Sequence, residues 1–146
     1  MKMKLKEYTK NVKDIINSAI RKFDFPVQLI CPRKLIIKEN ILNKNAHMIL
    51  EKSIYEIIKT MKPYSKENSP IYITVFDDLN LDIKISFKTH EINEEELVFC
   101  LCPFYEKENR LKKLYWIEKQ LILIGGKIEL KKEQNGITIS IELRKL

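Results

Sequence analysis

The fold is decided near the C-terminus, where residues 124–143 read IGGKIELKKEQNGITISIEL. Asn135-Gly136 predicts a tight hairpin turn, because both residues readily adopt the backbone conformation that such turns require. Apolar and polar residues alternate on either side of it, so we expect strands at Lys127–Glu133 and Ile137–Leu143. Gly125-Gly126 ends the element before them, since glycine favours the C-terminus of a helix.

The same kind of pattern predicts the elements that precede this hairpin. Apolar residues recur at helical spacing in three segments: Leu5–Phe23, residues 43–62 and Glu106–Ile124. Short apolar or alternating stretches predict four more strands: Val27–Cys31, Lys34–Lys38, Ile71–Phe76 and Leu81–Phe87. We therefore expect one α+β domain over residues 1–146, a two-layer sandwich with helices on one face of a mixed, mostly antiparallel sheet.

Composition excludes several classes of protein. The chain has 146 residues, of which 45% are hydrophobic and 32% charged, so it can bury a core and keep a solvated exterior. No apolar run reaches the roughly 18 residues of a membrane span. The basic residues 1–6 lead into an amphipathic pattern, without the apolar stretch of a signal peptide. We expect a cytoplasmic protein that makes no membrane contact.

The metal-binding side chains are sparse. The three cysteines are Cys31, Cys100 and Cys102, an odd number that fits a reducing compartment. They form no CxxC pair, and His47 and His90 add no second ligand pair at a recognisable spacing. Buried free cysteines are therefore expected, and no metal site.

The C-terminal region resembles the end of the ATP-binding domain of sensor histidine kinases. In that family a helix closes on Gly-Gly and is followed by a charged strand, a glycine turn and an alternating strand. Here Gly125-Gly126 takes that place, with Ile124 where the family has histidine. Upstream, Leu101–Tyr105 is similar to the Phe-x-Pro-Phe-Tyr segment that opens the ATP lid, and Leu50–Ser65 resembles the helix carrying the N box. The order of these motifs covers nearly the whole chain and implies the Bergerat fold.

The resemblance also implies which residues would bind ATP, and this sequence departs from them. In the family an N-box asparagine holds magnesium, a hard cation that prefers oxygen ligands. Here Thr60 stands at that position, Lys59 lies near the family's acidic position, and Glu56 replaces an earlier asparagine as the remaining oxygen ligand. Thr89 stands where the aspartate of an Asp-x-Gly-x-Gly loop would read adenine, and both glycines are absent.

The glycine-rich lid of the family is missing as well. Glu106–Lys113 joins Tyr105 directly to the third helix, although close backbone approach to phosphate requires residues without Cβ. All 3 glycines of the chain lie after residue 124. We therefore expect side chains to fill the cleft between the second and third helices, the candidates being Tyr55, His90, Leu111 and Tyr115.

These departures favour a pseudo-ATPase, a non-catalytic signalling module that keeps the fold for its protein surface. Such a module would need no cofactor and would bind a response regulator or a sensor kinase. The alternative is a protein kinase that binds ATP and magnesium, like the anti-sigma-factor kinases, through an unorthodox site. Its candidate residues are Glu56, Thr60, His90 and Lys112. Whether His47 accepts a phosphoryl group stays open.

The basic charge supports a further alternative. The net charge is +7, and residues 1–22 hold seven basic side chains against two acidic ones. Such a balance attracts acidic partners, and a nucleic-acid-binding regulator is a second alternative. The sequence shows no interleaving of aromatic and basic residues on one face, however. A solvated helix face is the simpler explanation of these lysines.

Overall fold

The computed structural model describes residues 10–30, 41–42, 44–77, 80–90 and 113–144. No helix within these ranges is long and apolar enough to cross a membrane. The elements in chain order are β1 (Lys10–Asn11), α2 (Val12–Ile20), β2 (Val27–Ile30), β3 (Ile41–Leu42), α3 (Lys44–Met61), the 3-10 helix η2 (Lys62–Tyr64), β4 (Ile71–Asp77), β5 (Asn80–Lys88), α5 (Lys113–Ile122), β6 (Gly126–Glu133) and β7 (Gly136–Arg144).

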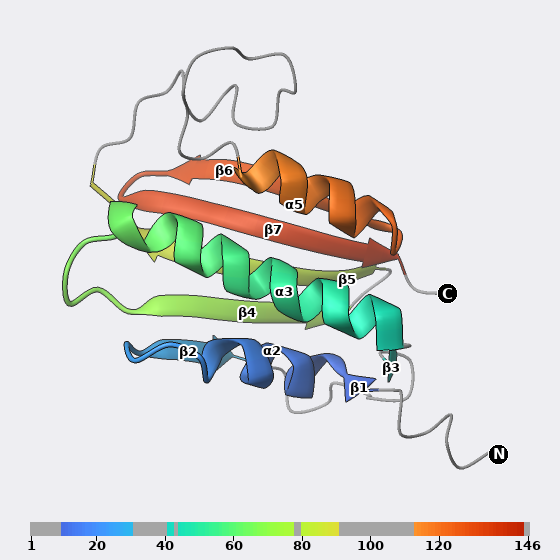
Figure 1. The fold of residues 1–146 in the computed structure, drawn as a ribbon. Helices are drawn as coiled ribbons and strands as arrows, with labels where there is room; N and C mark the ends of the chain where they lie inside the picture. The colour runs from blue at the N-terminus through green and yellow to red at the C-terminus, as the bar shows by residue number, and fades with distance from the viewer. Residues whose placement is uncertain (1–9, 31–40, 43, 78–79, 91–112, 145–146) are drawn as a thin grey trace, which may run out of the picture.

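The main sheet has five strands in the order β2-β4-β5-β7-β6 (Figure 1). The outer strand β2 pairs parallel with β4, whereas the other three pairings are antiparallel. A separate two-residue pairing joins β1 to β3. The mixed, mostly antiparallel sheet and both predicted hairpins, β4 with β5 and β6 with β7, are therefore confirmed.

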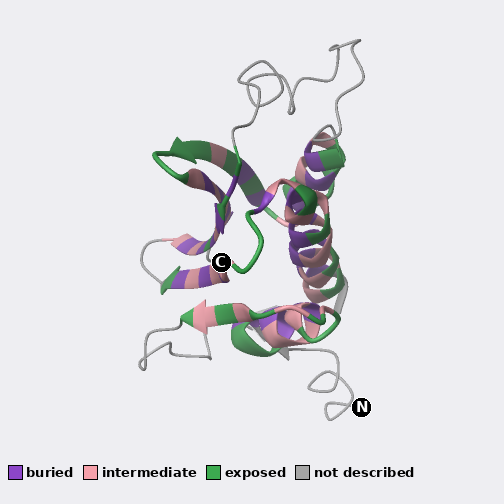
Figure 2. Ribbon diagram, turned by 90° about the vertical axis from the view of Figure 1, so that its left-hand side faces the viewer, coloured by how far each residue is buried: buried purple, intermediate pink, exposed green. Residues whose placement is uncertain are grey.

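The helices α2, α3 and α5 lie side by side on one face of this sheet (Figures 1 and 2). Alternate side chains of β5 and β7 are buried beneath them, as the period of a strand requires. The apolar stripe of α3 packs onto these strands, with the fully buried residues Leu50, Ile54, Ile57, Ile58 and Met61. No described element covers the opposite face, so the two-layer sandwich is confirmed (Figure 2).

Two glycines have structural roles at the C-terminal hairpin. Gly125 has φ = 75°, a left-handed conformation that ends α5, and its carbonyl oxygen accepts a hydrogen bond from the Arg144 N–H. Gly136 lies so close to β5 that an added Cβ would stand 1.9 Å from the carbonyl oxygen of Phe87. Both positions exclude larger residues for reasons of backbone geometry.

The first helix differs from the prediction. A helix from Leu5 is wrong at Lys10-Asn11, because these two residues form β1, and the helix ends at Ile20. Strands of two residues are too short to show a period, so the sequence pattern did not reveal them. The predicted strand Lys34–Lys38 and the first part of the predicted third helix, residues 106–112, lie outside the described residues.

Candidate functional site

The flank of α3 that faces α5 carries two of the candidate residues. Glu56 and Thr60 are four residues apart and therefore lie on the same side of the helix. Both are half-buried, and the buried Ser53 lies one turn before Glu56. We call this side of α3 the α5 flank.

An ion pair crosses the gap between the two helices on the α5 flank. The Nζ atom of Lys113, the first residue of α5, lies 2.5 Å from Oε2 of Glu56. The Glu56 side chain is only 16% exposed and the Lys113 side chain 50% exposed, and Oε2 itself is shielded from solvent. Partial desolvation strengthens the attraction relative to a fully exposed pair. The ion pair therefore links the start of α5 to the middle of α3.

A second set of contacts joins the end of β5 to the segment that follows α3. Thr89, directly after β5, is buried and pairs with Ser65 in an isolated β-bridge. The Thr89 N–H donates a hydrogen bond to the carbonyl oxygen of Asn135 (3.2 Å), and the Lys66 N–H donates one to Lys88 (2.8 Å). Thr89, which replaces the adenine-reading aspartate of the resemblance, is thus held by backbone pairing on two sides.

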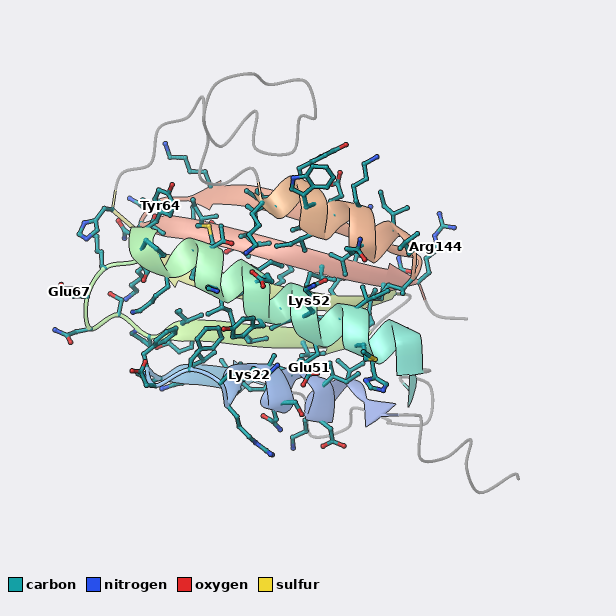
Figure 3. The ribbon with its side chains drawn as sticks, in the orientation of Figure 1. Lys22, Glu51, Lys52, Tyr64, Glu67 and Arg144 are labelled. Atoms are coloured by element: carbon teal, nitrogen blue, oxygen red, sulfur yellow. The ribbon has the colours of Figure 1, made fainter. Side chains whose placement is uncertain are left out.

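The predicted filling of the cleft by side chains is wrong for two of its four candidates. The ring of Tyr55 stacks on Phe23, at 5.0 Å between centroids, on the side of α3 that faces α2. One residue corresponds to a rotation of about 100° around a helix, so Tyr55 and its neighbour Glu56 point to different flanks. His90 is exposed, and its backbone N–H donates a hydrogen bond to the carbonyl oxygen of Tyr64 (Tyr64 is labelled in Figure 3).

The remaining candidates are only partly located. Tyr115 is half-buried and meets Trp116 edge to face at 5.2 Å. Leu111 and Lys112 lie outside the described residues. His47 is half-buried near the start of α3, roughly 14 Å along the helix axis from Glu56. The structure therefore brings Glu56 and Thr60 together, leaves His47 apart from Glu56, and exposes His90.

The sequence analysis missed a cluster on the opposite side of α3, which we call the α2 flank. Here the residues that follow α2 and the C-terminal part of α3 bring basic and aromatic side chains together. We name this cluster the basic–aromatic patch, which consists of Lys22, Phe23, Phe25, Tyr55, Lys59 and Lys62. Its two halves are about thirty residues apart in sequence, so no local pattern could have signalled it.

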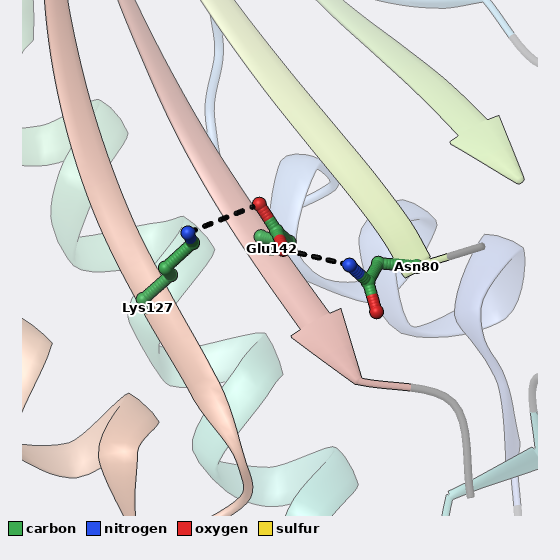
Figure 4. A network of polar contacts seen from close by, with 3 residues as sticks. All are labelled: Asn80, Lys127 and Glu142. Atoms are coloured by element: carbon green, nitrogen blue, oxygen red, sulfur yellow. Dashed lines mark hydrogen bonds and ion pairs between the residues drawn. The ribbon is translucent and has the colours of Figure 1, made fainter. Parts of the chain in front are cut away.

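The uncovered face of the sheet forms a shallow hollow of about 470 Å³ lined by residues of β4, β5, β6 and β7. Both acidic and basic side chains line this hollow, and some of them pair with each other. Glu142 accepts a hydrogen bond from Asn80 Nδ2 at 2.8 Å and pairs with Lys127 Nζ at 3.5 Å (Figure 4). A mixed surface with an internal network of this kind shows no preference for one class of ligand.

Comparisons with known proteins find likeness in structure and none in sequence. No protein-family model and no curated protein matches the chain. The nucleotide-free catalytic domain of histidine kinase ThkA has a TM-score of 0.73 at 17% identity, with 94% of each chain covered. Histidine kinase AdeS of Acinetobacter baumannii has a TM-score of 0.69 at 14% identity, covering 94% of this chain and 66% of that one.

The mycobacterial sensor histidine kinase MprB gives the same result. Its TM-score is 0.68 at 12% identity, covering 94% of this chain and 98% of that one. Likeness at such low identity establishes the fold and nothing finer. The chain has the fold of a histidine kinase catalytic domain, as the resemblance in its motifs predicted.

Proposed function

We propose that this chain is a pseudo-ATPase, a non-catalytic regulatory module that binds a protein partner and no nucleotide. The observation that carries the proposal is the ion pair between Lys113 and Glu56. Among the described residues of the α5 flank, Glu56 is the only side chain that could give magnesium a charged oxygen ligand. An ammonium group 2.5 Å from that oxygen repels a second cation from it.

The other positions that the resemblance implies support the same function. Thr60 offers a neutral hydroxyl group, a weak ligand for magnesium compared with a carboxylate or a carbonyl oxygen. Thr89 provides no carboxylate to accept a hydrogen bond from an adenine amino group. None of the glycines lies before residue 125, so no glycine-rich loop is present in that part of the chain to approach phosphate. The described donors therefore do not fit a magnesium–nucleotide group.

The exposed apolar residues of α5 and of the turn after it support the binding of a protein partner. Trp116 is 62%, Ile122 56% and Leu123 71% exposed. Trp116 lies in α5, Ile122 is its last residue and Leu123 begins the turn that follows. Several large exposed apolar side chains close together are typical of interaction surfaces, where tryptophan is enriched. A response regulator or a sensor kinase is the expected partner, in the cytoplasm.

Calorimetric titration with ATP and with ADP, each with and without magnesium, tests the nucleotide half of the proposal. We expect no saturable heat and no thermal shift at millimolar nucleotide. Saturable, magnesium-dependent binding that is lost in Glu56→Gln would contradict the proposal. It would restore the alternative of an ATP-binding protein kinase that uses Glu56, Thr60, His90 and Lys112.

Sedimentation velocity with a purified response regulator and a purified sensor kinase of the same organism tests the partner half. We expect a complex with one of them that Trp116→Ser combined with Leu123→Ser abolishes. The matched control is Gln120→Ser, an exposed polar position on the same helix. A chain that sediments alone in both mixtures would contradict the expected partner class.

A further inference from the structure

The basic–aromatic patch lies where two helices end together. In Figure 1, α2 and α3 both run from the side of β1 and β3 toward the opposite side of the molecule. The patch combines residues that follow α2 with residues of the C-terminal part of α3 and Lys62 just after it. The Nζ atoms of Lys22 and Lys59 lie 5.3 and 5.9 Å from the centroid of the Tyr55 ring (Lys22 is labelled in Figure 3). The Nζ atom of Lys62 lies 4.4 Å from the centroid of Phe25.

The three rings form one connected platform for these lysines. The ring of Phe23 stacks on Tyr55 at 5.0 Å and packs against Phe25 at 4.9 Å. All three rings are half-buried against the core, so their positions are fixed by packing. Cation–π contacts hold the ammonium groups near the ring faces while leaving them open to solvent. The patch therefore presents three positive charges in an ordered arrangement.

These three charges are not neutralised within the part of the chain that the structure describes. None of Lys22, Lys59 and Lys62 makes an ion pair there, in contrast to Lys113 on the other flank. Asp24, an exposed carboxylate in the same turn, makes none with them either. A cation near a helix C-terminus is favoured by the helix dipole. The helix dipole explains lysines near a helix C-terminus, but it does not explain why aromatic rings lie beneath them.

The geometry also distinguishes between two kinds of anionic partner. Single-stranded nucleic acid binds to platforms on which bases stack against free aromatic faces. Here Phe23 and Tyr55 stack on each other, and two ammonium groups lie over Tyr55. Carboxylates need only the ammonium groups, and apolar side chains next to them can contact the edges of the half-buried rings.

We propose that the basic–aromatic patch docks an acidic segment of a protein partner, in which carboxylates are interspersed with apolar side chains. This inference rests on the proposed function in one respect, that the chain is a protein-binding module. The surface is separate from the apolar residues of α5, since α3 lies between α2 and α5 (Figure 1).

Fluorescence anisotropy with a labelled helical peptide of interspersed glutamate and leucine residues tests the inference. The patch variant combines Lys22→Glu, Lys59→Glu and Lys62→Glu. The control variant combines Lys13→Glu, Lys84→Glu and Lys131→Glu, three exposed lysines elsewhere, and changes the net charge equally. Lys84 also lies over a ring, 5.2 Å from the centroid of Phe76, so the control includes a cation–π lysine. We expect the patch variant to lose about tenfold or more of the affinity for the peptide. The control variant should lose less than about twofold.

Three outcomes would overturn the inference. The first is no binding of the peptide by the unmodified chain, and the second is an equal loss in both variants, which indicates unspecific attraction. The third is tighter, patch-dependent binding of oligothymidine, which indicates a nucleic-acid surface. A Lys→Gln version of the patch variant, with the same thermal melt as the unmodified chain, excludes unfolding as the cause. Nucleotide binding in the separate titration would refute the pseudo-ATPase proposal and leave this result unchanged.

Discussion

The two flanks of α3 hold their neighbouring helices by different means. On the α2 flank, Tyr55 stacks on Phe23, and the lysines around the rings form no ion pair with any described residue. On the α5 flank, Glu56 pairs with Lys113, so the cation of that flank is neutralised. The difference indicates which flank can attract an anion from solution. Within the described residues the cations of the α2 flank form no ion pair, whereas on the α5 flank, where the resemblance places a nucleotide, the carboxylate and the lysine pair with each other.

The largest effect on stability is expected on the buried side of α3, which packs on the sheet beneath both flanks. Ile57 is fully buried between the flanks and packs on the sheet. We expect Ile57→Ala to lower the free energy of unfolding by about 3 kcal/mol, because it leaves a cavity beneath α3. Chemical denaturation measures this loss, and Ile57→Val serves as the matched control with a loss of about 1 kcal/mol. Equal effects of the two variants would show that α3 readjusts, and the flanks would then not depend on a rigid helix.

The α2 flank should lose more from truncation of its ring than from removal of its hydroxyl group. We expect Tyr55→Ala to lower the free energy of unfolding by about 2 kcal/mol, because the stacking on Phe23 and the buried ring area are lost. Tyr55→Phe keeps the ring and should cost less than about 0.5 kcal/mol. Thermal and chemical denaturation of both variants provide the measurement. A large loss in Tyr55→Phe would mean that the hydroxyl group, and not the aromatic stacking, holds α2.

The sequence predicted the elements of this fold better than it predicted the site. The alternation of apolar residues along β5 and β7 and the apolar stripe of α3 are local patterns. Gly125 and Gly136 mark turns whose backbone geometry disfavours any residue other than glycine. Their order along the chain, together with the motif resemblance, was enough to identify the fold. The prediction failed at both ends of the first helix, because β1, a strand of two residues, has no period and α2 already ends at Ile20.

The site depends on contacts that sequence spacing does not encode. Glu56 and Lys113 come from different helices, and only the packing of α3 beside α5 brings them together. Tyr55 was assigned to the wrong flank because periodicity defines the buried stripe of a helix and leaves open which neighbour each side will face. The basic–aromatic patch combines residues from two helix ends, so no window of the sequence contains it.

On the α5 flank, removal of the lysine of the ion pair should lower the free energy of unfolding more than removal of the carboxylate. Lys113→Gln leaves the shielded Oε2 of Glu56 without its cation, whereas Glu56→Gln leaves a lysine that water can solvate. We expect Lys113→Gln to cost about 1 kcal/mol of unfolding free energy and Glu56→Gln less than about 0.5 kcal/mol. A double-mutant cycle at low and high salt measures the coupling. Equal losses, or a cycle without coupling, would show that the pair does not hold α5 to α3.

The smallest effect concerns Glu118 on α5, which makes no ion pair with either flank of α3 among the described residues. Burial raises the pKa of Glu118 above its ordinary value, and the neighbouring Lys119 acts in the opposite direction. The folded state therefore binds the proton more tightly than the unfolded state. Ionised Glu118 destabilises the fold at neutral pH, and this cost disappears as the pH falls through the raised pKa.

We accordingly expect Glu118→Gln to be slightly more stable than the unmodified chain at neutral pH, by about 0.5 kcal/mol or less because solvent screens the partly exposed group. The difference should vanish in acid, where Glu118 is protonated. Denaturation at a series of pH values measures it, and Lys119→Gln should enlarge the cost by removing the compensating charge. A Glu118→Gln variant that is less stable at neutral pH would mean that the carboxylate stabilises α5. A second charged group besides Lys113 would then help to hold this helix in place.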